Sequence, residues 1–155
     1  MIFTTHIIVG GTTGSIINNP YLAFAGGFIS HHIIDAIPHL DPGSFTRLQP
    51  KKKFWEVPKI IAVIFADVAV GSVVFYLLWR YAGYPLPMLA GAVGAVISDV
   101  VDNGPWQDTI RKYSPFKKFH VFHEKYHRTV LPQQWLLGIL TQLVLIIASV
   151  AIIVG

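Results

Sequence analysis

One stretch of the chain concentrates side chains that can bind a metal ion. Residues 30–41 read Ser-His-His-Ile-Ile-Asp-Ala-Ile-Pro-His-Leu-Asp and close an apolar run that begins at Tyr21. In a helix, His31 and Asp35 lie four residues apart on one face, with His32 three residues before Asp35. Imidazole and carboxylate groups at this spacing can hold a divalent cation. Ionisable groups at membrane depth are functional by default, which favours a metal site over a polar helix cap.

A second histidine cluster follows near the C-terminal end of the chain. His120, His123 and His127 stand at i, i+3 and i+7, which is one stripe of a helix. The same residues spell His-Glu-x-x-His, in which Glu124 would be the general base of a zincin-type protease. The charge of Lys125 and the lack of a downstream third ligand argue against a protease. A basic, aromatic helix at the membrane surface is the other interpretation. We predict metal ligands here, with His123 and His127 first.

Three carboxylates within apolar runs are further candidates. Asp67 lies among Val, Ile, Phe and Ala, where a bare carboxylate costs several kcal/mol and therefore needs a cation, a proton or a donor. Asp99 and Asp102 share one helical face at the end of another run, where the helix dipole disfavours negative charge. A nearby cation would explain both. We predict Asp102 as a ligand, and Asp67 and Asp99 as catalytic bases or as partners that orient ligating histidines.

The composition places these residues in a membrane protein. Of the 155 residues, 53% are hydrophobic and 13% are charged, about half the charged fraction of a soluble domain. The chain has no Cys, so a metal must use nitrogen and oxygen ligands. The net charge of +4 comes from basic residues between the apolar runs. There they set topology or meet anionic lipid, so we expect no nucleic-acid partner.

The apolar runs predict an all-α integral membrane protein with one domain over residues 1–155. About five transmembrane helices are expected, at residues 2–17, 21–37, 60–81, 88–101 and 135–154. The small residues of the fourth run predict close helix packing. Residues 106–134 are polar and basic and predict a cytoplasmic interfacial helical segment.

The basic loops also predict the orientation. The loops that follow the second and fourth runs carry most of the Lys and Arg, so they should face the cytoplasm, with the N-terminus inside and the C-terminus outside. This topology brings the candidate groups to one face of the membrane. They are His6, His31, His32, Asp35, His39, Asp99, Asp102, His120, His123 and His127.

Part of the chain resembles a known family. Residues 27–35, with Pro38 and Gly43 behind them, resemble the Gly-x-x-Ser-His-x-x-x-Asp stretch of the small bacterial and archaeal membrane-bound metal-dependent hydrolases. Thr5-His6 resembles the N-terminal His of that family. The resemblance implies a location in the prokaryotic inner membrane and a relation to zinc-dependent phospholipase C. It also implies metal ligands at His6, His31 and Asp35.

Two other motifs of that family are not reproduced. Asp99 and Asp102 only loosely match its Pro-Asp-x-Asp-His motif, because Ser98 replaces the Pro and the spacing is wider. Its His-Arg-x-x-Thr-His motif is not reproduced by the His-Arg-Thr sequence that begins at His127. The resemblance therefore favours a metal hydrolase but specifies neither its reaction nor its substrate.

The expected function is metal-dependent hydrolysis at the cytoplasmic leaflet. The substrate would be a phosphoester or acyl bond of a lipid-like molecule, with the basic loops holding an anionic headgroup. Zinc is the first choice of metal, and iron or manganese are alternatives. Three other classes stay open: a zincin-like membrane protease, a proton or metal-ion transporter or channel that uses Asp67 and the histidines, and a His-rich di-iron membrane oxidase. The sequence specifies no oligomeric state.

Overall fold

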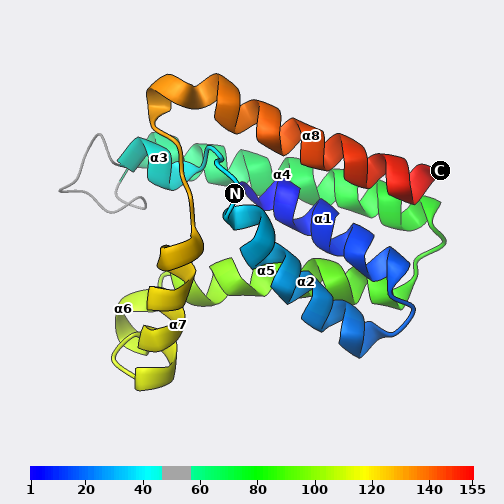
Figure 1. Ribbon diagram of the computed structural model, residues 1–155, viewed down its shortest axis with the longest axis horizontal. Coiled ribbons are helices and arrows are strands. Elements are labelled where there is room, and N and C mark those ends of the chain that lie inside the picture. The colour runs from blue at the N-terminus through cyan, green and yellow to red at the C-terminus, as the bar shows by residue number, and fades with distance from the viewer. Residues whose placement is uncertain (47–56) are drawn as a thin grey trace.

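The structure, a computed structural model, describes residues 1–46 and 57–155, and most of that part of the chain is helical (Figure 1). Within it, the only strand-like pairing is an isolated bridge between His39 and Thr129. The predicted all-α class is confirmed. The long helices are α1 (Phe3–Ile16), α2 (Pro20–Asp35), α4 (Pro58–Tyr81), α5 (Leu86–Asn103) and α8 (Trp135–Val154). The shorter ones are α3 (Pro42–Thr46), α6 (Gln107–Ile110), α7 (Ser114–Tyr126) and the 3₁₀ turn η2 (Pro132–Gln134).

Within residues 1–46 and 57–155, three helical segments are long and apolar enough to cross a membrane. They are α4, α5 and the continuous segment Pro132–Val154, which joins η2 to α8. α1 and α2 contain 14 and 16 residues, whereas a span needs about 20 residues at 1.5 Å each. The arrangement with five spans therefore stays a prediction.

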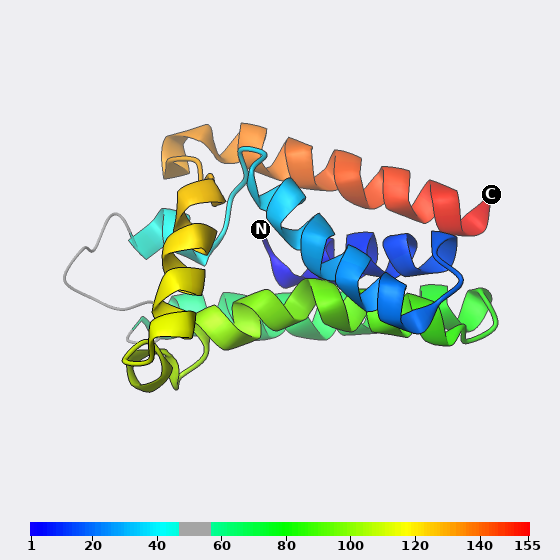
Figure 2. The same ribbon diagram turned by 60° about the horizontal axis from the view of Figure 1, so that its bottom comes forward.

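The short helix α1 lies in the middle of the bundle, in contact with α2, α4, α5 and α8 (Figures 1 and 2). Its Gly and Thr residues let neighbouring helices approach from several sides. The hydroxyl of Thr12 donates to the carbonyl of Ile8 over 2.9 Å, and that of Thr13 to Val9 over 3.0 Å. Bonds of this kind keep the hydroxyls satisfied away from water.

α1, α2 and α5 pack at close range through glycines. A Cβ atom on Gly27 would lie 2.0 Å from the carbonyl oxygen of Gly91, and one on Gly91 would lie 2.3 Å from that of Gly10. The backbones meet directly at these positions, as the small residues of the fourth run predict. Gly27 precedes His31 by four residues, so the same helical face carries the histidine toward α5.

The outer helices expose apolar side chains, as lipid-facing helices do. On α4, Phe65 and Val73 are exposed, and on α8, Leu136, Val144 and Ile147 are exposed. Soluble proteins seldom expose apolar surface along the whole length of neighbouring helices, so this surface fits a lipid environment.

The polar elements gather at one end of the bundle. There α7 crosses the ends of the long helices, close to the end of α2 and to α5 (Figure 2). The predicted interfacial segment 106–134 is largely helical, as α6, α7 and η2. The basic residues between 47 and 53, which contribute to the predicted orientation, lie outside the described residues.

Candidate metal centre

Asp35, the last residue of α2, lies at the centre of the histidine cluster and is 1% exposed. Its Oδ1 atom lies 3.3 Å from Nε2 of His6 and also contacts the amino group of Met1. Its Oδ2 atom lies 3.3 Å from Nε2 of His31 and 3.4 Å from Nε2 of His123. One buried carboxylate thus meets imidazoles from α1, α2 and α7.

A first group of potential ligands forms around this carboxylate. The ligand atoms of His31, Asp35, Asp99 and His123 all lie within 4.8 Å of one another. The Nε2 atoms of His31 and His123 are 3.2 Å apart. Oδ1 of Asp99 lies 3.9 Å from Nε2 of His123. Two imidazole nitrogens and two carboxylates converging on one point form a donor set that suits a divalent ion.

His6 adds an unpartnered imidazole to the first group. Its ring stacks on that of His31 with 4.2 Å between centroids. Nε2 lies 3.6 Å from Oδ2 of Asp99. Among the described residues, neither ring nitrogen of His6 has a hydrogen-bond partner, although the side chain is 1% exposed. Buried polar atoms are nearly always paired, so this histidine fits a site completed by a ligand.

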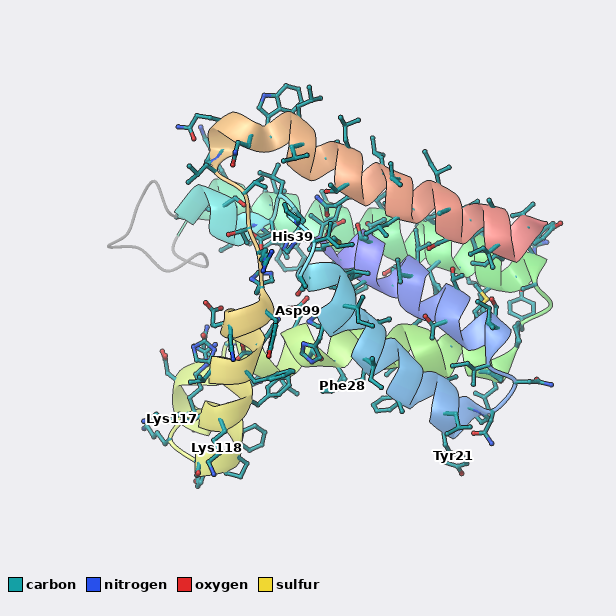
Figure 3. The ribbon with its side chains drawn as sticks, in the orientation of Figure 1. Tyr21, Phe28, His39, Asp99, Lys117 and Lys118 are labelled. Carbon is teal, nitrogen blue, oxygen red and sulfur yellow. The ribbon has the colours of Figure 1, made fainter. Side chains whose placement is uncertain are left out.

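A second group of potential ligands shares the same carboxylate. The ligand atoms of Asp35, His39 and His127 lie within 4.8 Å of one another. The Nε2 atoms of His39 and His127 are 3.1 Å apart. Oδ2 of Asp41 lies 3.1 Å from Nε2 of His127 and 3.7 Å from that of His39. His39 and Asp99 lie where the end of α2, α5 and α7 meet (Figure 3).

Backbone pairing between two connecting segments holds this second group. The amide of Arg128 donates to the carbonyl of Asp35 over 2.8 Å, and that of His39 donates to Arg128 over 3.1 Å. The amide of Val130 then donates to the carbonyl of His39 over 2.8 Å. His127 is the C-terminal cap of α7: its amide donates to the carbonyl of His123 over 3.0 Å, and the extended pairing begins at the next residue, Arg128.

Two acceptors orient the ligating rings. Nδ1 of His123 lies 3.0 Å from Oδ2 of Asp102, and Nδ1 of His39 lies 2.8 Å from the carbonyl of Ile37. When Nδ1 carries the proton in these bonds, the lone pair is left on Nε2, which faces the cluster. Partners of this kind characterise metal-binding histidines.

These contacts and the burial of the groups shift the pKa values of Asp41, His39 and His123. Burial alone would raise the pKa of Asp41, but the hydrogen bonds from His127 and His39 hold that pKa well below its usual range. Burial lowers the pKa of His39. Burial alone would also lower the pKa of His123, but Asp102 and Asp35 outweigh it and raise that pKa to about 9.

The structure places Asp102 behind the ligands. Its carboxylate accepts from Nδ1 of His120 at 3.0 Å and from Nη2 of Arg111 at 3.0 Å, in addition to His123. Asp102, His120 and Glu124 also satisfy the distances of a potential ligand group. Glu124 is exposed, and exposed acidic groups commonly lie at such distances without an ion. This group is therefore a weaker metal site than the two around Asp35.

Two other predicted residues lie outside the convergence on Asp35. Asp67 caps α1: its Oδ2 accepts from the amide of Phe3 over 2.6 Å, and its Oδ1 from the hydroxyl of Thr4 over 2.6 Å. Negative charge at a helix N-terminus is stabilising. His32 is surrounded by aromatic rings, with Phe28 at 5.0 Å and Phe122 at 5.1 Å between centroids. Its nitrogens lie near those of His31 and His123.

Two residues of the site were not among the predicted ligands or bases, although Asp41 belongs to the stretch that predicts the metal. Asp41 contacts both histidines of the second group, and Arg111 pairs with Asp102. Asp41 closes the His-rich stretch, so its proximity to His39 was a usable signal. No feature of the sequence singled out Arg111, because it is one of several basic residues in a loop that was used only to predict the membrane orientation.

In the part of the chain that the structure describes, the fold and the site define an all-helical protein with three candidate membrane-spanning helices and buried His/Asp groups that could hold a metal ion. Their nitrogen and oxygen donors are of the kind that divalent metal ions take in proteins. In comparisons with known proteins, no family model matches the chain, and neither a curated protein nor a solved structure matches it.

Proposed function

We propose that this protein is a metal-dependent hydrolase of the prokaryotic inner membrane that acts on a phosphoester or acyl bond of a lipid-like substrate at the cytoplasmic leaflet. The observation that carries the proposal is the first ligand group, in which His31, Asp35, Asp99 and His123 converge at one end of a bundle with candidate membrane spans. A bound divalent ion, zinc in the first instance, would lower the pKa of a water molecule and polarise the oxygen of the scissile bond.

Asp99 is the residue best placed to accept a proton. Its side chain is 32% exposed, whereas those of His31 and Asp35 are at most 1% exposed. Nδ2 of Asn103 donates to its Oδ1 over 3.1 Å, which holds the carboxylate at the edge of the cluster. A carboxylate that reaches both the ligands and solvent can take a proton from water and release it.

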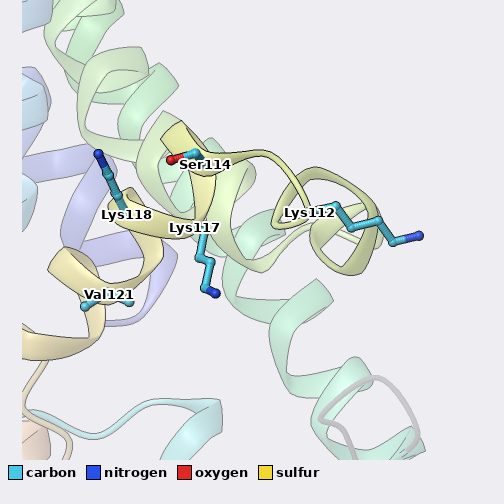
Figure 4. A pocket seen from close by; sticks show the side chains of 5 residues that line it. All are labelled: Lys112, Ser114, Lys117, Lys118 and Val121. Atoms are coloured by element: carbon cyan, nitrogen blue, oxygen red, sulfur yellow. The ribbon is translucent and has the colours of Figure 1, made fainter.

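The surface beside the site suits an anionic headgroup. Lys112, Lys117 and Lys118 line a hollow with Ser114 and Val121 (Figure 4). Lys118 precedes His123 by five residues, about 7.5 Å along α7. Exposed Phe116 and Phe122 lie on the same helix. A basic helix with aromatic side chains is typical of segments that lie on anionic membranes.

The geometry favours this reaction over a zincin-type protease. In a zincin, the two histidines of His-Glu-x-x-His ligate one ion from a single helix, and the Glu faces that ion. Here His123 belongs to the first group and His127, beyond the end of α7, to the second. Glu124 is exposed and satisfies ligand distances only with Asp102 and His120 among the described residues.

The test compares two carboxylate variants in purified, metal-loaded protein. Phospholipid analogues and a casein-type substrate are assayed side by side. We expect lipid hydrolysis by the wild type, with Glu124→Gln keeping its metal and most of its activity. Asp99→Asn should keep its metal but lose about 10²-fold or more in turnover, the scale of a lost general base. Proteolysis by the wild type, abolished in a metal-replete Glu124→Gln variant, would overturn the proposal in favour of the protease.

A further inference from the structure

We propose that the site holds two divalent metal ions, with Asp35 as their shared ligand. The proposal rests on the metal centre of the proposed function but not on the reaction assigned to it. The first ion would be bound by His31, His123 and Asp35, with Asp99 beside it as the proton acceptor, and the second by His39, Asp41 and His127 with Asp35.

The position of Asp35 is the first observation. Its Oδ2 atom lies 3.3 Å from Nε2 of His31 and 3.4 Å from that of His123, the histidines of the first group. The same oxygen lies 3.6 Å from Nε2 of His127 in the second group. One carboxylate therefore faces both sets of imidazoles, which is how a bridging carboxylate is placed between two ions about 3.5–4 Å apart.

The two histidine pairs are the second observation. His31 faces His123 with 3.2 Å between Nε2 atoms, and His39 faces His127 with 3.1 Å. Two bare nitrogen lone pairs at this distance repel, so each pair needs a proton or a cation between its members. The Nδ1 atoms of His123 and His39 donate to Asp102 and Ile37, so Nε2 is the nitrogen of each ring that faces its partner and would bind a cation with release of any proton it carries. Each pair also has its own carboxylate besides Asp35, as a separate cation site requires.

The buried, unpartnered nitrogens of His6 and His31 are the third observation. Both nitrogens of His6 and Nδ1 of His31 have no hydrogen-bond partner among the described residues, and neither side chain is more than 1% exposed. They lie beside Asp35 and Asp99. The unpaired nitrogens of His6 favour a cation beside Asp35 and Asp99, where His6 would be a further ligand of the first ion, while Asp41 completes the second group independently.

Zinc stoichiometry tests the proposal directly. Chelator-stripped protein in detergent is loaded with Zn²⁺ alone, desalted and analysed for zinc per chain. We expect two zinc ions in the wild type and one in His39→Ala and in Asp41→Asn. In both variants the second site loses a ligand, so its zinc affinity should fall further than after loss of an orienting partner, which costs about 10- to 100-fold. One zinc ion in the wild type would overturn the proposal.

A spectroscopic readout and a matched control complete the test. With Mn²⁺ in place of zinc, the wild type should give the spectrum of two spin-coupled ions, and His39→Ala that of an isolated ion. His120→Ala, in which a neighbouring histidine outside both groups is removed, should keep both zinc ions and the coupling. Uncoupled Mn²⁺ in a wild type with two bound ions would place the second ion elsewhere and refute the shared role of Asp35.

The outcomes separate this proposal from the proposed function. Two coupled ions without hydrolysis of any assayed substrate would leave the paired centre standing and remove the hydrolase. Hydrolysis by protein with one bound ion would support the hydrolase and remove the paired centre. Absence of binding by the folded wild type, judged by its helical circular dichroism, would remove both.

Discussion

Replacing Asp102 with Asn should weaken zinc binding although Asp102 itself does not face the ions. Its Oδ2 atom holds Nδ1 of His123 at 3.0 Å and thereby directs Nε2 toward the first ion. Loss of such a partner typically lowers metal affinity 10- to 100-fold, or about 1.4–2.8 kcal/mol at 1.4 kcal/mol for each factor of ten. The substitution keeps the side-chain volume, so packing around α5 should be preserved.

The assay is a competition for Zn²⁺ between chelator-stripped protein and a chromophoric chelator at fixed pH. Helical circular dichroism and elution volume check that the variant is folded. Glu124→Gln is the matched control, because it neutralises an exposed carboxylate adjacent to His123 and should leave the affinity within about twofold, well below the effect of a lost orienting partner. Wild-type affinity in folded Asp102→Asn would refute the orienting role of Asp102.

Three further predictions test the fold and the site. Gly27→Ala should lower the free energy of unfolding by about 1–3 kcal/mol, because the new Cβ would meet the backbone of Gly91. Gly26→Ala is the control: its Cβ would meet only the ends of the Ile17 and Thr13 side chains, so thermal unfolding should show a smaller effect. Asp67→Ala should lower the free energy of unfolding by about 0.5–2 kcal/mol, because α1 loses its cap. Elemental analysis should find the zinc content of the wild type. Loss of zinc would show that Asp67 belongs to the metal site. A C-terminal alkaline phosphatase fusion should be active and a fluorescent-protein fusion dark, and the reversed pattern would contradict an outside C-terminus.

Residue types and spacing predicted the convergence of His31, Asp35 and His123 well. Histidines and carboxylates at helical spacing lie on one face of their helix. The apolar runs between these groups then place them at the same end of the bundle. The predicted fifth run, 135–154, coincides with α8. These features depend on local periodicity, which the sequence contains directly.

The position of Asp102 behind the ligands depended on helix rotation. Three residues differ by about 60° around a helix, so spacing alone could not say which carboxylate meets the ligands and which meets Arg111. The role of Asp67 depended on a different helix, because only packing brings the start of α1 beside α4. The end of α7 at Tyr126 also escaped prediction, since the pairing of His39 with Thr129 competes with the last helical turn. Tertiary contacts of this kind override local pattern.

The ligands come from both ends of the chain, and this separation has a consequence for biogenesis. His6 and His127 flank the same carboxylate of Asp35 although 120 residues lie between them. Synthesis proceeds at about 5–20 residues per second, so α1 and α2 leave the ribosome seconds before α7 exists. During that interval the cell would hold an inserted but incomplete donor set, able to capture whichever loosely held cation is abundant. Correct loading would then have to follow the docking of α7, as a late maturation step controlled by metal supply.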